Sequence, residues 1–156
     1  MSLNTKVEDR LDRLTEQLRL APALTCDLIS TVMAEACTRL LVLRSAGKAV
    51  RIDRLIEAGA WNDAALTLIE LELPAWKLRR LICEDGQWFC SLSKQPNLPV
   101  ELDETADARH EVSALAILSA FVEARRMTSA ARGIRSQTVP QIRSKSGRAI
   151  CCDNFA

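Results

Sequence analysis

Apolar and polar residues alternate with a helical period over most of the chain. Over residues 4–20, apolar residues recur at alternating spacings of four and three, which predicts an amphipathic helix with a short seam flanked by charge. The seam consists of Val7, Leu11, Leu14 and Leu18. Two heptads are too few for a stable coiled coil alone, so the seam must dock on the rest of the chain or on a second copy. These four residues are the predicted interaction residues.

Three more helices are predicted in the next part of the chain. Thr25 is a good N-cap residue for a helix that runs to about Ser45. Shorter helices are expected over residues 51–58 and 63–73, with Gly59 ending the first of them. Two short helices joined through a glycine have the order of a helix-turn-helix.

Residues 77–93 have the pattern of a β-hairpin. Asp85 and Gly86 lie between two runs rich in apolar residues, and this pair suits the two positive φ values of a type I′ turn. The expected pairs on the core side are Cys83 with Trp88, Leu81 with Cys90, and Arg79 with Leu92, while Ile82 and Phe89 lie on the other face.

A final long helix is predicted over residues 103–126, because the stretch 112–122 is almost entirely apolar. Residues 127–156 show no periodicity and are expected to be a disordered, basic tail. The predicted organisation is a single domain over residues 1–126, which begins with the helix 4–20, followed by this tail. The fold class is α+β and mostly helical, with about five helices and one hairpin, in an order compatible with a winged-helix domain.

Charge and composition narrow the class of protein. The net charge is +1, divided into −3 for residues 1–126 and +4 for residues 127–156. An acidic body is poorly suited to binding a polyanion across a broad surface. No apolar run is long enough to span a membrane, and the N-terminus lacks an export signal, so a cytoplasmic protein with reduced thiols is expected. The six cysteines are Cys26, Cys37, Cys83, Cys90, Cys151 and Cys152.

Few residues suggest chemistry. His110 is the only histidine, and a dyad with Cys90 would need a third orienting group and a lowered thiol pKa, neither of which the sequence signals. The acidic clusters are expected to be structural or solvated; they are Glu70 with Glu72, and Asp103 with Glu104 and Asp107. No glycine-rich phosphate loop occurs. We therefore expect no catalytic residues, no metal or cofactor, no small-molecule substrate and no enzymatic activity.

Two functions fit these features. The first is a non-catalytic protein–protein interaction module (an adaptor, a regulator or an assembly subunit), with a partner protein or a homo-oligomer formed through helix 4–20. The alternative is a winged-helix-like DNA-binding regulator, with Lys77, Arg79 and Arg80 near phosphates. The supposed recognition helix, residues 63–73, has three acidic residues and no lysine or arginine, which disfavours nucleic acid.

Residues 51–126 also resemble a family of small bacterial proteins with no assigned activity. Three segments carry the resemblance: Trp76-Lys-Leu-Arg-Arg-Leu, Asp85-Gly-Gln-Trp, and Leu115-Ala-Ile-Leu-Ser-Ala-Phe-Val-Glu-Ala. The resemblance implies a bacterial, cytoplasmic protein. It implies no cofactor and no catalytic residue.

Overall fold

The computed structural model describes residues 3–135 of the chain, and the side chains of residues 5–134. Within this part the chain forms six α-helices, one short 3₁₀ helix and a three-stranded antiparallel sheet, so the predicted α+β, mostly helical fold class is confirmed. The elements are α1 (Leu3–Leu20), α2 (Cys26–Ala36), α3 (Arg39–Ser45), α4 (Val50–Glu57), α5 (Trp61–Glu72), β1 (Lys77–Glu84), β2 (Gln87–Ser93), η1 (Val100–Leu102), β3 (Thr105–His110) and α6 (Ser113–Arg135).

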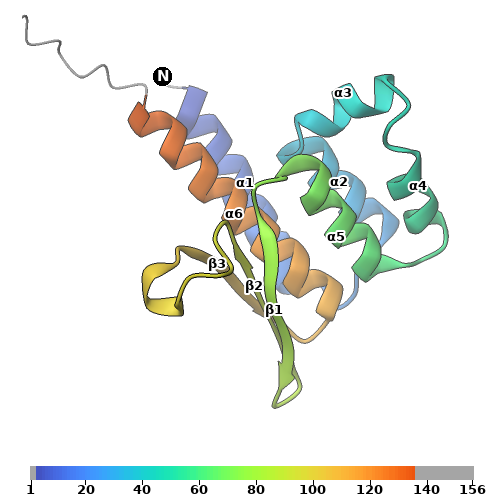
Figure 1. Cartoon of the computed structure of the whole chain (residues 1–156). Helices are drawn as coiled ribbons and strands as arrows, with labels where there is room; N and C mark the ends of the chain where they lie inside the picture. Colours follow the sequence, from blue (N-terminus) through green and yellow to red (C-terminus); the bar gives the residue numbers. More distant parts are fainter. Residues whose placement is uncertain (1–2, 136–156) are drawn as a thin grey trace, which may run out of the picture.

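Helix α6 is the centre of the molecule. The sheet, in the order β1-β2-β3, packs on it through β2 and β3, while α1 and α5 pack against other sides of α6. Figure 1 shows α1 and α6 side by side behind the sheet, with α2 to α5 grouped on one flank. Every residue from Leu115 to Leu118 is fully buried, which explains why this helix has apolar residues all round.

The seam of α1 docks on its own chain. Leu11, Leu14 and Leu18 are buried, and α1 contacts α6 and α2. Val7, at the start of the seam, is 38% exposed. Of the two docking options that the sequence leaves open, the structure therefore shows the first, and only Val7 of the seam remains available to a second copy.

The helix predicted to run from Thr25 to Ser45 is two helices. Its N-cap is confirmed, because the Thr25 hydroxyl accepts a hydrogen bond from the backbone N–H of Leu28 at 3.2 Å. The chain then leaves helical geometry at Cys37, which is extended, and begins α3 at Arg39. This break frees the first backbone N–H groups of α3 to bind a side chain from elsewhere in the fold. The next two helices, α4 and α5, lie within two residues of their predicted bounds.

The hairpin forms with the predicted turn and one change of register. Asp85 and Gly86 both have positive φ. The predicted cross-strand pairs Leu81–Cys90, Ile82–Phe89 and Cys83–Trp88 all occur. However, Leu92 faces Leu78 and not Arg79, because a bulge between Leu78 and Arg80 leaves Arg79 outside the ladder. Cys90 and Leu92 are fully buried, so the predicted core side is confirmed.

The prediction of helix over residues 103–112 is wrong, because the third strand, β3, lies there. Ala106 is buried against the rest of the core, while Asp107 and Arg109 point to solvent, which is the two-residue period of a strand. The small alanines let β3 approach α6 closely. Alanine is also the best helix former, so local propensity pointed the wrong way.

Helix α6 also extends further than predicted. It runs to Arg135, so residues 127–135 are helical, and the predicted domain boundary at residue 126 falls inside a helix. The rest of the predicted tail, residues 136–156 with Cys151 and Cys152, lies outside the described residues.

The hairpin is one part of a sheet that packs on α6, and it makes few contacts with α5. It therefore does not flank α5 as a wing would flank a recognition helix. Among residues 3–135, no helix combines the length and apolar character needed to cross a bilayer.

Candidate functional site: a basic pocket beside a buried carboxylate

A buried carboxylate ties three helices together. Glu72, at the end of α5, has a side chain with no solvent exposure. Its Oε1 accepts hydrogen bonds from the Thr38 N–H at 2.8 Å and the Thr38 hydroxyl at 3.2 Å, and its Oε2 accepts from the N–H groups of Arg39 at 3.0 Å and Leu40 at 3.1 Å. Arg125 of α6 completes the shell, with Nη2 3.6 Å from Oε1 and 3.1 Å from the Thr38 hydroxyl.

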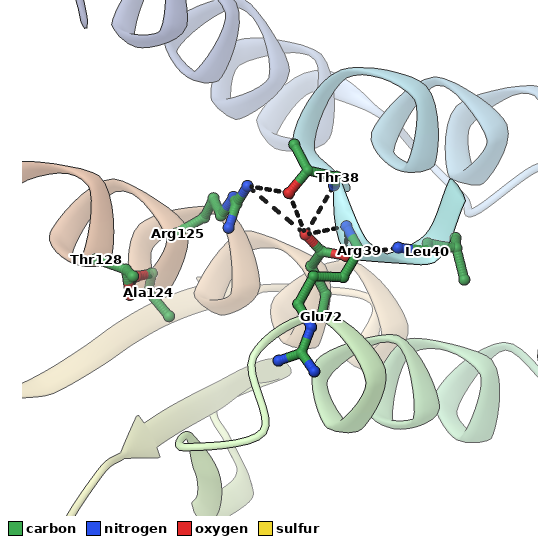
Figure 2. A network of polar contacts seen from close by, with 7 residues as sticks. All are labelled: Thr38, Arg39, Leu40, Glu72, Ala124, Arg125 and Thr128. Carbon is green, nitrogen blue, oxygen red and sulfur yellow. Dashed lines mark hydrogen bonds and ion pairs between the residues drawn. The ribbon is translucent and has the colours of Figure 1, made fainter. Parts of the chain in front are cut away.

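This arrangement explains why a charge can be buried here. The N-cap residue of α3, Thr38, makes no side-chain cap of its own, so the carboxylate of Glu72 takes that place from another helix. Both carboxylate oxygens are saturated by donors, and Arg125 supplies the counter-charge. Figure 2 shows these groups converging on Glu72. The negative charge of Glu72 is therefore matched within the protein.

A pocket of about 290 Å³ opens directly beside this network. Its apolar wall is built around Trp76, which is buried and whose indole N–H donates to the Thr128 hydroxyl at 3.1 Å. Lys94 lies over the same ring, with Nζ 5.0 Å from the ring centroid, in cation–π geometry. The volume is just below the roughly 300–1,000 Å³ range of ligand sites, which suits a side chain or a small anion.

The lining of the pocket is strongly cationic. It holds the four cations Arg39, Lys94, Arg125 and Arg132, against the single carboxylate of Glu72, a net charge of +3. The side chains of Arg39, Lys94 and Arg132 have no acidic partner within the described part of the chain. Since Glu72 is already saturated, the groups that face the pocket attract an anion.

The pocket is assembled from four separate segments. Arg39 comes from the start of α3, Trp76 from the turn between α5 and β1, and Lys94 from the loop after β2. Arg125, Thr128 and Arg132 follow one another at helical spacings of three and four, and thus share one face of α6. Sequence reasoning missed this site because its cations are far apart in the chain, and because Arg132 was assigned to the tail. The spacing of Arg125 and Arg132 was the one available signal.

The residues proposed for nucleic-acid contact are separated by the fold. Arg79 is largely buried in an ion pair with Asp103, and its other guanidinium nitrogen donates to the backbone oxygen of Leu98 at 2.9 Å. Lys77 and Arg80 are exposed on β1. The guanidinium of Arg79 is therefore engaged inside the protein.

The Cys90–His110 dyad considered from the sequence lacks an activated thiol. Burial, together with the smaller effect of the nearby charge of Asp107, raises the pKa of the Cys90 thiol to about 12. His110 lies at the end of β3, opposite Trp88, and its Nδ1 accepts a hydrogen bond from the Val112 N–H at 3.0 Å. Cys90 faces Ala108. The thiol thus stays protonated at neutral pH.

The acidic clusters of the sequence are dispersed. Glu70 is exposed while Glu72 is buried. Asp103 accepts from Arg79 and from the Ser93 hydroxyl, and Asp107 accepts from Ser91. Across residues 3–135 no group of three or more potential metal ligands comes together.

No family model, curated protein or solved structure matches this chain. The resemblance to small bacterial proteins therefore stays a prediction.

Proposed function

We propose that this chain is a non-catalytic protein-binding module that recognises an acidic segment of a partner protein through its basic pocket. One observation supports this most: three cations without an acidic partner among the described residues surround a pocket with an indole wall. Unmatched charges around a concave site lower the stability of the free protein through mutual repulsion, and a bound carboxylate would relieve that repulsion.

The shape and the surroundings of the pocket favour a protein partner over a nucleic acid. The positive charge is gathered in one pocket of about 290 Å³, whereas residues 1–126 as a whole carry −3. A nucleic acid presents a phosphate at each nucleotide and needs an extended basic surface. A carboxylate side chain of a peptide needs only one local site, and a guanidinium matches it with paired hydrogen bonds.

The test is fluorescence anisotropy with a fluorescein-labelled octaglutamate peptide and the full chain. Replacing Lys94 and Arg132 with alanine should weaken binding about tenfold or more, because two charges that face the ligand are lost. The control variant replaces Lys77 and Arg80 with alanine; it removes the same net charge from the exposed hairpin, and its affinity should stay within about twofold of the wild type.

Two outcomes would overturn the proposal. The first is that octaglutamate does not bind the wild-type chain. The second is that both variants lose affinity equally, which would show that net charge alone, and not the pocket, attracts the peptide. A labelled DNA duplex is titrated in parallel. DNA binding that depends on Lys77 and Arg80 would favour the winged-helix alternative instead.

A further inference from the structure

The solvent face of α3 is unusually apolar. Leu41 is 62% exposed and Val42 is 68% exposed, although α3 has only seven residues and Leu40 is already buried as its anchor. Single exposed apolar side chains are normal on a protein surface. Two consecutive large ones on a short helix, next to a charged pocket, form a contiguous apolar surface that would gain from being covered.

This apolar face continues directly from the pocket. Arg39 lines the pocket at the first position of α3, and Val42 is three residues further on. Residues three apart lie on the same side of a helix, separated by about 4.5 Å along its axis. Leu41 lies beside Val42 on the solvent side, and the Arg44–Asp53 ion pair, at 2.6 Å, stands near the other end of α3. A partner that fills the pocket would therefore reach the apolar face within one helical turn.

Hydrogen bonds from the start of α3 to the buried carboxylate of Glu72 fix the position of this helix. Glu72 binds the backbone N–H groups of residues 38–40, and Arg125 holds Glu72 and Thr38 in place. The pocket and the apolar face thus share one rigid support, so that the distance between them is set by the fold. A rigid pairing of a cationic pocket with an apolar face selects ligands by the spacing of their groups.

We infer that the partner segment is acidic and amphipathic, an inference that rests on the proposed function of the basic pocket. One carboxylate of the segment occupies the pocket among Arg39, Lys94 and Arg132. A large aliphatic side chain, close to that carboxylate in the partner's sequence, covers Val42 and Leu41. The positive charge of the pocket favours the carboxylate of the segment, and burial of apolar surface on α3 supplies the additional affinity.

The experiment compares two labelled peptides of equal charge on the full chain. One has the sequence Glu-Glu-Leu-Glu-Glu-Leu-Glu-Glu, and the other has alanine in place of both leucines. The leucine peptide should bind about tenfold more tightly to the wild-type chain, because it buries apolar surface on α3. In the variant L41S/V42S this advantage should fall below about twofold, while the affinity for the alanine peptide stays the same.

The matched control is V100S/L102S, which removes one valine and one leucine of similar exposure from the 3₁₀ helix η1. It should retain the full preference for the leucine peptide. Equal binding of the two peptides to the wild-type chain would overturn this inference and leave the proposed function standing. A preference that is lost equally in both double variants would also overturn it. If neither peptide binds, the proposed function fails as well.

Discussion

Two regions of this molecule gather arginine around a buried carboxylate, and they differ in how the charges balance. In the first, Arg79 meets Asp103, and the two are joined by Ser93 and by the backbone of Leu98. One cation meets one anion, and both are largely buried. In the basic pocket, the carboxylate of Glu72 is saturated, yet three further cations stand around it.

Clustering of cations along the sequence is a poor guide to where unmatched positive charge gathers in the fold. Lys77, Arg79 and Arg80 are neighbours in the sequence, but the fold uses Arg79 to hold the loop after β2. Arg39 and Lys94 come from distant segments and meet at the pocket. Charge that remains unmatched after folding is the better indicator of a site for an anion.

The largest expected effect is the loss of the Glu72 carboxylate. Glu72→Ala should lower the free energy of unfolding by about 3–5 kcal/mol, because Arg125 and three backbone N–H groups lose their buried partner. Urea denaturation measures this. Glu70→Ala is the matched control, since Glu70 is exposed on the same helix, and it should change stability by less than about 0.5 kcal/mol. Equal stabilities of the two variants would contradict the structural role of Glu72.

The carboxylate of the other region should matter nearly as much. Asp103→Ala should cost about 2–3 kcal/mol, because it leaves the largely buried guanidinium of Arg79 and the hydroxyl of Ser93 without their shared acceptor. The neighbouring exposed residue gives the control: Glu104→Ala should have an effect below about 0.5 kcal/mol. A small loss for Asp103→Ala would mean that this ion pair is dispensable.

Substitution of the cations should lower the stability of the protein in the first region and leave it nearly unchanged in the basic pocket. Arg79→Gln should destabilise by about 2 kcal/mol, since it leaves Asp103 buried without a counter-charge. Lys94→Gln and Arg132→Gln should change stability by less than about 0.5 kcal/mol, because each removes a charge that is repelled by its neighbours. Urea denaturation of the three variants, side by side, measures the contrast. A substantial loss for Arg132→Gln would reveal a structural partner for this side chain.

The smallest effect concerns the reactivity of the two buried thiols, Cys37 and Cys90. Cys37 precedes the Glu72 network, and its thiol pKa is raised to about 12 by burial and then by the charge of Glu72, against the opposing effect of Arg125. Cys90 lies in β2 with a similarly raised pKa. Both should react with an aromatic disulfide reagent only as the protein unfolds. The exposed thiols of Cys26 and Cys83 should react at once.

This measurement uses a variant with serine in place of Cys151 and Cys152. The raised pKa values of Cys37 and Cys90 also predict how the stability of the protein depends on pH. Each of these thiols has a higher pKa in the folded state than in the unfolded state, where it is about 8.5, so its contribution to the free energy of unfolding should be constant below about pH 8 and should fall as the pH rises above it. Rapid labelling of Cys37 or Cys90 at neutral pH would contradict their burial.

Periodicity and turn chemistry were sufficient to predict much of the fold. The α1 seam, the Thr25 cap and the Asp85–Gly86 turn were all identified from local pattern, because each depends on neighbours within a few residues. Strand β3 was missed because its inward residues are alanines, which favour helix locally. The end of α6 was missed because polar residues after Met127 give no apolar stripe, although Thr128 contacts Trp76.

The candidate site could not be predicted in the same way. The break between α2 and α3 depends on Glu72, more than thirty residues further along the chain, so no local signal marks it. The pocket depends on the same long-range contacts. The sequence predicted only that Glu70 and Glu72 are structural or solvated, because two residues two apart do not share a helix face, and it did not single out Glu72.

The most direct test of the basic pocket is to observe Trp76 while a ligand binds. The chain has three tryptophans, so its ¹H–¹⁵N spectrum has three indole signals, and Trp76→Phe assigns the relevant one. On titration with octaglutamate, the indole N–H of Trp76 should shift most, because it donates to Thr128 at the wall of the pocket. The signals of Trp61 and Trp88 should stay in place. A shift of Trp61 or Trp88 while Trp76 remains unchanged would contradict binding at this site.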